Sequence, residues 1–559
     1  MSTTLTHNPS RVVAERAGRD LTRPGALLGR VVLLLGLGLL IVYPLVMVVG
    51  SVFFAEAWGA RPLSLADLSA GRVVAAWRNT LVLGGLVTVI SVLFALPAAL
   101  LAYRSRLAWL VDVVMTVPFL TPPFLVSLAW LQVTGRRGYA SRLGLDGVLI
   151  GDLLISVGGM AVLMAVNYAP LVYFALRAQL SRLPSGLTWA AAVAGAGRWT
   201  RLFTIVLPLM VPALLAGGFL AFASAIGEYG TPLVIGQRIG FPVVATEIAR
   251  LVSVYPIDLS LASALGSTLV VVGAGAYWLS RVFRGYPLKG STLGPAGAPP
   301  MLGVVGRIIA VAVTAFFALV GVVVPLASLA TTSLLRLISA GPVASNLTVA
   351  NFVTLFEPGA GGMAAISASL SLALVAAGLG LFLGLLAARA GRAAAFLATL
   401  PVAIPAITMA VGFIRGWNAP WLAQFPVYGT GTILALYYLA QYLPFVVQYV
   451  QAGQAGMPSS YEAAARVHGA NPRAALLHVS LPLLWPHALA GAIMMFSIGF
   501  RELVGSVLLR PPSVQTSSTF IMQQFDQGSI AVGTAMGLVA IVAALLATLT
   551  ARLFGGRTA

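Results

Sequence analysis

The chain of 559 residues contains no cysteine, one lysine and few charged residues of any kind. Without cysteine it can form no disulfide framework, no thiolate nucleophile and no cysteine-ligated metal site. The one lysine, Lys289, lies in the segment YPLKGST, so the chain has no G-x-x-x-x-G-K-[ST] loop to bind the phosphates of ATP. Charged residues make up 8% of the chain, whereas soluble domains average about 25%. These absences favour a polytopic membrane protein.

The polar residues that remain form none of the common catalytic or metal-binding patterns. Neither a Ser-His-Asp arrangement nor an H-E-x-x-H motif is present, and no metal-ligand spacing joins the four histidines, His7, His468, His478 and His487. The net charge of +19 comes from arginines scattered between apolar runs, whereas nucleic-acid-binding proteins gather them on one face. We therefore expect no catalysed reaction, no bound metal and no nucleic-acid partner.

What the chain has in abundance is long apolar runs, and 59% of its residues are hydrophobic. Runs of about 20 residues are long enough to cross the roughly 30 Å hydrocarbon core of a bilayer. In the first half they lie near 31–54, 79–102, 110–132, 154–177, 206–227 and 261–283. In the second half they lie near 304–330, 364–388, 394–414, 430–450, 482–503 and 531–554. The sequence thus predicts an all-α polytopic membrane protein with about twelve transmembrane helices.

The third run of each half contains a P-x-x-x-P pattern. The prolines are Pro118 and Pro122 in the first half and Pro401 and Pro405 in the second. Proline inside a membrane helix removes a backbone hydrogen bond, which neighbouring helices can compensate. We therefore predict a kink in both third spans.

Many residues recur in the second half at an offset of 274 positions. The paired positions include Tyr168 and Tyr442, Pro170 and Pro444, Gly195 and Gly469, Pro208 and Pro482, and Glu228 and Glu502. Repeated coincidences at one offset indicate an internal duplication. We expect a polar tail over 1–26, a first six-span module over 27–285, a linker over 286–301 and a second module over 302–559. Because each module has an even number of spans, the two form a parallel repeat.

A polar segment over 458–482 interrupts the apolar runs of the second half. Ser459 followed three residues later by Glu462 is a capping-box pattern, which predicts a short helix starting near Tyr461. Gly469 is placed to end that helix, and Asn471 with the proline after it is placed to begin a second one. The sequence thus predicts a helix, a glycine break and a second helix before the fifth span.

The basic residues indicate which way the chain crosses the membrane. With the N-terminus inside, 21 of the 33 basic residues fall in cytoplasmic segments, leaving 12 outside. Cytoplasmic segments of membrane proteins are enriched in arginine and lysine. We therefore expect both termini, and the segments around Gly195 and Gly469, to lie in the cytoplasm, with the spans in the lipid bilayer.

The segment around Gly469 resembles the EAA loop of ABC importer permeases. The shared features are Glu-Ala-Ala, a glycine, and a Leu-Pro whose proline follows that glycine by thirteen residues. In that family the loop forms a coupling helix that docks onto the ATPase subunit. The residues that the resemblance assigns to coupling are Ala190, Ala191 and Gly195 in the first copy and Glu462, Ala463, Ala464 and Gly469 in the second. The family's acidic position falls on Ala463 and, in the first copy, on Trp189, so we expect two unequal docking surfaces.

Two six-span halves, each with such a loop before its fifth span, resemble a fused type I ABC importer permease. The segments SAIGEYGTPLVIG and RELVGSVLLRPP look most like the fused ferric iron permeases, and thiamine, polyamine and phosphonate permeases share the plan. The resemblance implies a bacterial inner-membrane protein that works with a dimer of cytoplasmic ATP-binding subunits. It also implies a periplasmic or lipid-anchored substrate-binding protein, and alternating access driven by ATP bound on the separate subunits. The permease itself is implied to hold no cofactor and to catalyse no covalent step.

Glu228 and Glu502 each follow a Leu-Pro by 20 residues, about 30 Å along a helix, so each is expected at the outer end of a fifth span. In one interpretation they form a symmetric acidic mouth of the pathway, which suits a cationic substrate such as ferric iron. In the other they are ordinary carboxylates at the membrane interface. Arg501 is a candidate partner for Glu502, but its counterpart in the first copy is Gly227, so pairing does not explain both carboxylates.

Two other classes of protein share part of this pattern. A twelve-span secondary transporter also has two six-span halves, but it normally carries buried ionisable groups for ion coupling, and these spans have almost none. A structural or assembly protein of the membrane gives no reason for two matched loops. The ABC permease is therefore the favoured interpretation.

Overall fold

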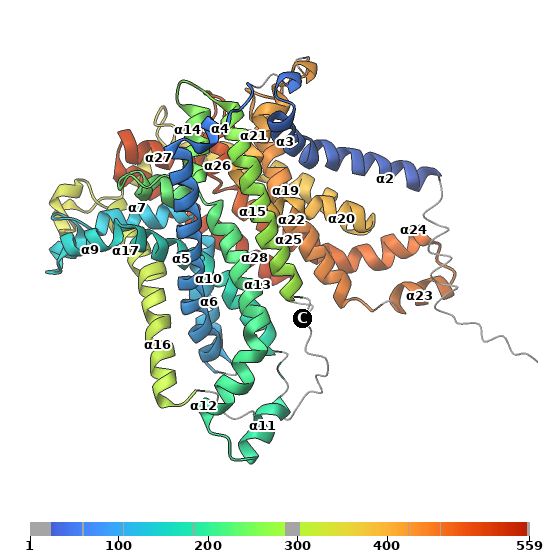
Figure 1. The fold of residues 1–559 in the computed structure, drawn as a ribbon, viewed down its shortest axis with the longest axis horizontal. Coiled ribbons are helices and arrows are strands. Elements are labelled where there is room, and N and C mark those ends of the chain that lie inside the picture. The colour runs from blue at the N-terminus through green and yellow to red at the C-terminus, as the bar shows by residue number, and fades with distance from the viewer. Residues whose placement is uncertain are drawn as a thin grey trace, which may run out of the picture.

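The fold is all-helical in the computed structural model of the full chain (Figure 1). The structure describes residues 24–58, 61–103, 105–181, 183, 185–284, 302–422, 424–458 and 460–555. Among these residues, ten helices are long and apolar enough to cross a membrane, and two bent helix pairs bring the number to twelve if each pair is one span. The predicted fold class is confirmed. The predicted linker lies outside the described residues, and helix α2 begins at Pro24, inside the predicted tail.

The helices follow the order of the apolar runs, with short helices between them. The first half contains α2 (Pro24–Leu37), η1 (Gly38–Val42), α3 (Tyr43–Phe53), α4 (Leu65–Ser69), α5 (Gly71–Ala102), α6 (Ala108–Leu120), α7 (Pro123–Val133), α8 (Tyr139–Arg142), α9 (Gly147–Leu154), α10 (Val157–Ser181), α11 (Ser185–Val193), α12 (Arg198–Arg201), η3 (Leu202–Val206), α13 (Leu207–Ile226), η4 (Pro232–Gly236), α14 (Val244–Ser253) and α15 (Leu259–Arg284).

The second half repeats this order. It contains α16 (Val304–Ala318), η5 (Leu319–Val323), α17 (Val324–Ser333), α18 (Ala350–Thr354), α19 (Gly362–Arg389), α20 (Arg392–Thr399), η8 (Leu400–Ala403), α21 (Ala406–Trp417), α22 (Gly431–Gly456), α23 (Ser460–Val467), α24 (Pro472–Ala475), η10 (Leu476–Ser480), α25 (Leu481–Gly499), α26 (Val504–Leu509), α27 (Ser517–Gln527) and α28 (Ile530–Gly555).

The third predicted span of each half is a bent pair of helices, which corrects the expectation of a kinked but continuous helix. Helices α6 and α7 meet at 95°, and the helical segment ending at Ala403 meets α21 at 111°. Pro122 and Pro405 each stand immediately before the second helix of their pair, in extended backbone with ψ of 131° and 134°. The P-x-x-x-P pattern therefore marks a sharp break, since a proline lacks the N–H that would continue the helix.

The first span of each half packs against the opposite half. Helix α3 lies against α21 of the second half as well as α15 of its own, whereas α16 and α17 of the second half lie against α5 and α7 of the first. Figure 1 shows the dark blue α2 and α3 near α20 and α21, and the yellow-green α16 beside the blue α5. The first helices of each half thus pack against the other half, and this exchange holds the two halves together.

Polar contacts to backbone carbonyls hold both exchanged helices in place. The hydroxyl of Ser328 donates to the Ala129 carbonyl at 2.8 Å, and the indole of Trp130 donates to the Val320 carbonyl at 3.0 Å. On the other side, the hydroxyl of Tyr43 donates to the carbonyl of Gly416 at 2.8 Å. Each donor satisfies a carbonyl inside the helical bundle, where water is scarce.

Four spans contain a five-residue π-helical turn that ends two residues before a proline. The turns are η1, η3, η5 and η10, and the prolines are Pro44, Pro208, Pro325 and Pro482. A proline ring crowds the carbonyl four residues earlier in an α-helix, and the wider π turn relieves that contact. The Leu-Pro dipeptides of the repeat therefore carry a local distortion that occurs in both halves.

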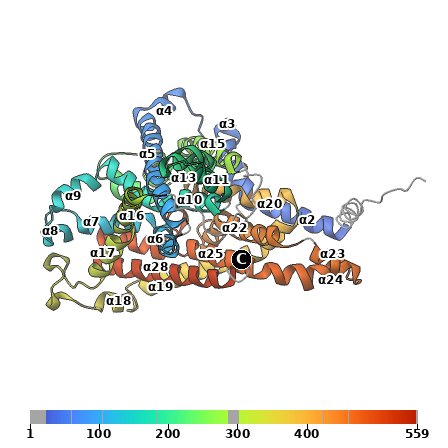
Figure 2. The same ribbon diagram turned by 90° about the horizontal axis from the view of Figure 1, so that it is seen from below.

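The short helices between α10 and α13, and those between α22 and α25, lie far apart. Figure 1 places α11 and α12 at the bottom of the molecule and α23 and α24 at its right, and Figure 2 shows the same separation from below. The opposite ends of the spans converge near α14, α26 and α27. The two halves therefore diverge toward the face that carries the repeated loops, which we call the loop face.

Candidate coupling loops and central cavity

The segment around Gly469 has the predicted geometry. Helix α23 ends at Val467, Gly469 adopts a φ of +87°, and α24 begins at Pro472. The side chain of Asn471 accepts a hydrogen bond from the amide of Ala474 at 2.8 Å and so caps α24. Glycine suits the break because positive φ is strained for residues with a Cβ. The helix, break and second helix are confirmed, whereas the predicted cap Ser459 lies outside the described residues.

The first copy has the same local structure. Helix α11 ends at Val193, Gly195 adopts a φ of +82°, and α12 begins at Arg198. A Cβ on Gly195 or on Gly469 would meet no atom within 4 Å. Both glycines are therefore needed for their backbone conformation and not for close packing.

Both loops expose apolar side chains at the loop face. Val193 and Val467, which occupy equivalent positions in the repeat, are each 84% exposed. Ala190, Ala463 and Ala464 are exposed, Ala191 is half-buried, and Trp189 and Tyr461 are also open to solvent. The residues assigned to coupling thus form two small apolar surfaces on helices that project from the bundle.

Glu462 points back toward the spans. Its carboxylate accepts a hydrogen bond from the hydroxyl of Ser480 in η10 and forms an ion pair with Arg389, at the end of α19, at 3.2 Å. The Ser480 hydroxyl lowers the pKa of Glu462, partial burial opposes this, and the positive charge of Arg389 lowers it further. In the first copy the equivalent of Glu462 is the buried Thr188, and that of Ser480 is Val206. The second loop therefore has an ionic tether to its bundle at a position where the first has none.

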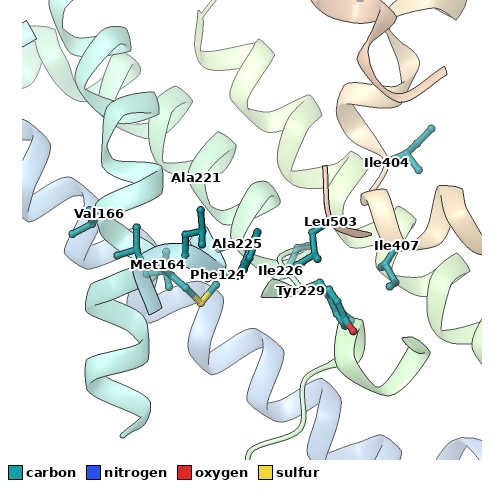
Figure 3. Packing of buried hydrophobic residues seen from close by; sticks show 14 of the residues in the cluster. Phe124, Met164, Val166, Ala221, Ala225, Ile226, Tyr229, Ile404, Ile407 and Leu503 are labelled. Carbon is teal, nitrogen blue, oxygen red and sulfur yellow. The ribbon is translucent and has the colours of Figure 1, made fainter. Parts of the chain in front are cut away.

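A cavity of about 360 Å³ lies between the two halves. It is bordered by the helix breaks at Pro122 and Pro405 and by the residues that follow the ends of α13 and α25. Its wall is built from residues related by the repeat. These include Tyr168 and Tyr442, Asn167 and Gln441, Gly227 and Arg501, Glu228 and Glu502, and the break prolines Pro122 and Pro405. Figure 3 shows the adjacent core, in which Leu503 of the second half lies among Ala225, Ile226 and Tyr229 of the first.

The carboxylates of Glu228 and Glu502 are buried in this wall, with residue exposures of 8% and 4%. Both oxygens of Glu228 accept from the amide of Thr231, at 3.0 and 3.1 Å. One oxygen of Glu502 accepts from the amide of Gly505 and the other from the amide of Ser506, each at 2.9 Å. Each carboxylate therefore satisfies backbone donors at the start of the helix that follows, and neither is exposed as an open mouth.

Arg501 does not pair with Glu502. Its Nη2 donates to the carbonyl of Phe119, at the break of the opposite half, at 3.0 Å. Gly227, its counterpart, approaches the opposite break in the same way, since a Cβ there would lie 2.9 Å from Cβ of Pro405. The position shared by Gly227 and Arg501 is thus an inter-half contact in both copies. Sequence analysis missed this, although the repeat itself had paired the two residues.

A second cavity of about 1080 Å³ opens toward the loop face. It runs from Phe119 and Phe445 past Tyr449 to Pro458 and Tyr461, beside the second loop. Phe119 and Phe445 also line the smaller central cavity. The two phenylalanines therefore stand between the central cavity and the larger cavity below it.

The described residues contain no group of three or more His, Asp or Glu side chains placed to hold a metal ion. The geometry instead provides a chain of cavities between two membrane-embedded halves and two projecting loops of equal shape. These features define a multi-pass membrane transport subunit.

Comparison with known families agrees with this architecture. Residues 70–284 and 376–559, one stretch in each half, match the family described as binding-protein-dependent transport system inner membrane component. Because these stretches cover more than half of the chain, it belongs to that family. It is a permease of the type I ABC importer class, as the resemblance of its loops indicated.

Several permeases resemble this chain individually. The ferric transport system permease protein FbpB of Actinobacillus pleuropneumoniae is 25% identical over an aligned length of 549 residues, and the alignment covers 93% of this chain and 76% of the relative. The molybdenum transport system permease protein ModB of Escherichia coli K12 is 34% identical over 164 residues, 27% of this chain and 69% of ModB. The sulfate transport system permease protein CysT of the same strain is 29% identical over 203 residues, 36% of this chain and 72% of CysT.

Proposed function

We propose that this permease imports ferric iron. The observation that carries the proposal is the similarity to FbpB across both halves, since 93% of the chain aligns, whereas ModB and CysT match about a third or less. The hard oxygen ligands that ferric iron prefers are present in the central wall as the carboxylates of Glu228 and Glu502. Both carboxylates line the central cavity, which Phe119 and Phe445 separate from the larger cavity that opens toward the loop face. This position suits an outer part of the pathway.

The two loops are proposed to dock onto a dimer of cytoplasmic ATP-binding subunits. Their exposed apolar helices, their matched glycines and their wide separation suit two equivalent partners. The first loop lacks the ionic tether that Glu462 gives the second, so the two docking sites are expected to respond unequally. A periplasmic or lipid-anchored binding protein would dock on the opposite face, near α14 and α27.

The substrate is tested by reconstitution. The chain is placed in proteoliposomes with its partner ATPase and binding protein, and uptake of radioactive ferric iron is measured with and without ATP. Molybdate uptake in the same vesicles serves as the competing substrate. ATP-dependent molybdate uptake without iron uptake would contradict the proposal, and uptake driven by an ion gradient alone would contradict the transport class.

The orientation is tested with single cysteines, because the native chain has none that could give background labelling. Val193→Cys and Val467→Cys report on the two loops, and Leu143→Cys reports on the opposite side. Their native side chains are similarly exposed, at 84%, 84% and 79%. An impermeant thiol reagent added to intact spheroplasts should label only the Leu143 variant. Labelling at Val467 would place the loops outside and rule out ATPase docking.

A further inference from the structure

The strongest unexplained feature of the central cavity is the charge of Arg501. Its Nη2 reaches the Phe119 carbonyl, but its buried Nε has no hydrogen-bond partner, and no described carboxylate forms an ion pair with it. The two neighbouring carboxylates are occupied by backbone amides. A guanidinium thus lines a cavity between the halves without an anion beside it.

Such a charge is costly in the interior of a membrane protein. A buried cation is normally paired, because removal from water is compensated only by an opposite charge and good hydrogen bonds. The buried Arg415 forms no ion pair with a described carboxylate either, but its Nε donates to the hydroxyl of Ser263 at 2.7 Å, whereas the Nε of Arg501 has no acceptor. Arg177 near the loop face pairs with Asp112 at 3.2 Å. Water in the cavity could supply hydrogen bonds to Arg501, but it would leave the charge uncompensated.

The rest of the wall also has unused hydrogen-bonding groups. Asn167 is 3% exposed, and its Oδ1 has no partner; the Oε1 of Gln441, its counterpart in the repeat, has none either. Tyr168 and Tyr442 line the same cavity, and both lie close enough to Arg501 to interact with it electrostatically. Phenol groups can donate to an anionic oxygen, and amide oxygens can accept from its protonated or hydrated form.

We propose that the central cavity binds an anionic oxygen group of the transported solute, with the guanidinium of Arg501 as its main donor and Tyr168 and Tyr442 beside it. The group comes either from a free oxyanion or from an oxyanion that is a ligand of the ferric ion. The proposal deepens the proposed function as a solute permease, but it does not depend on the solute being iron.

The carboxylates of Glu228 and Glu502 do not oppose this assignment. Their oxygens accept from the amides of Thr231, Gly505 and Ser506, so their negative charge is directed at helix starts and not at the cavity centre. A volume of about 360 Å³ is at the small end of known ligand sites, which suits a small solute.

Binding is measured on the purified full chain in nanodiscs, without ATPase or binding protein, by thermal unfolding followed through its ten tryptophans. Sodium phosphate and sodium molybdate are titrated at constant ionic strength against sodium chloride. A ligand that binds only the folded state raises the melting temperature. The wild type should show a saturable rise with at least one oxyanion.

Arg501→Gln should abolish this rise or weaken the apparent affinity by about tenfold or more, because hydrogen bonds to charged groups contribute strongly. In chloride alone the same variant should melt close to the wild type, because loss of the hydrogen bond to the Phe119 carbonyl is offset by removal of an unpaired, half-buried charge. Arg510→Gln is the matched control: Arg510 is exposed, donates to the Val514 carbonyl and does not line the cavity, so its rise should be retained. Tyr442→Phe provides a second variant that preserves the packing.

The proposal would be overturned if oxyanions left the melting temperature of the wild type unchanged, or raised it equally in the wild type and Arg501→Gln. Loss of the rise in melting temperature in Arg510→Gln would also overturn it. Pyrophosphate alone and ferric pyrophosphate distinguish the two sources. Tighter binding of the ferric complex indicates a metal-bound oxyanion, whereas equal binding indicates a free one. Absent iron uptake in proteoliposomes, with the Arg501-dependent rise intact, would refute iron as the substrate and leave the oxyanion site standing.

Discussion

The two central carboxylates look equivalent in sequence, but the structure predicts that they differ in their tolerance of substitution. The perturbation is the isosteric change Glu→Gln at each position, which exchanges one carboxylate oxygen for an amide NH2. At Glu502 the two oxygens serve two separate backbone amides, those of Gly505 and Ser506. At Glu228 both oxygens accept from the same amide, that of Thr231.

The size of the difference follows from this count. Glutamine at 502 can satisfy one amide with its oxygen, but its NH2 then faces the other, so one charge-assisted hydrogen bond is lost at a cost of about 1.5–3 kcal/mol. Glutamine at 228 can keep its oxygen on Thr231 and turn the NH2 away, so only the charge assistance is lost, at about 0.5–1.5 kcal/mol. We therefore expect Glu502→Gln to be the more destabilising change by about 1–2 kcal/mol.

Thermal unfolding of the purified variants, followed by tryptophan fluorescence, tests the order of stability, and iron uptake in proteoliposomes tests the role in transport. Parallel loss of uptake in both variants with unchanged affinity for the binding protein would support a cation pathway. Loss of uptake that follows the loss of stability would support helix capping alone. Equal melting temperatures, or a less stable Glu228→Gln, would refute the reasoning from hydrogen bonds.

The coupling loops give two further predictions. Gly469→Asp and Gly195→Asp should cost a similar ~1 kcal/mol of local backbone strain, because both glycines have positive φ and free space. Gly469→Asp should nevertheless reduce ATPase co-purification and coupled uptake more than Gly195→Asp; equal losses would show that the loops are equivalent. The pKa of Glu462 is lowered by the Ser480 hydroxyl and then by Arg389, so its contacts with these two residues stabilise the fold above the unfolded pKa of about 4.3, and this stabilisation is lost as pH falls through the folded value. The melting-temperature difference between wild type and Glu462→Gln should therefore be constant from pH 5 to 8 and shrink below about pH 4; a difference that persists in acid would show that the ion pair does not matter.

Much of this fold could be predicted from the sequence, because membrane spans are determined by length and apolar composition. The loop geometry was also predictable, since Gly469 and Asn471 act through local backbone chemistry. The sharp breaks at Pro122 and Pro405 were only partly predictable: the prolines indicated a distortion, but the angles depend on the helices packed around them. Each of the four π turns had a signal in the proline that follows it by two residues, which sequence analysis did not use.

The central cavity could not be predicted from composition. Glu228 and Glu502 follow the ends of α13 and α25 closely, but their burial depends on which segments fold over them. A usable signal existed, because each glutamate lies three residues before an amide that it caps, as capping acids do. The contact of Arg501 with Phe119 joins residues 382 positions apart, and no local pattern encodes it.

The exchange of first helices has a consequence for how the protein assembles. Neither half contains all the surfaces that cover its own core, because α3 shields α21 and α17 shields α7. A half made alone would expose grooves such as the one at Gly412, where a Cβ would lie 2.5 Å from the carbonyl oxygen of Pro44. We therefore expect the whole chain to fold as one cooperative unit. When only the first half has been synthesised, its packing surfaces for the second half are still exposed. When the two halves are synthesised as separate polypeptides, we therefore expect each to be degraded if expressed alone and to be stable if both are expressed together.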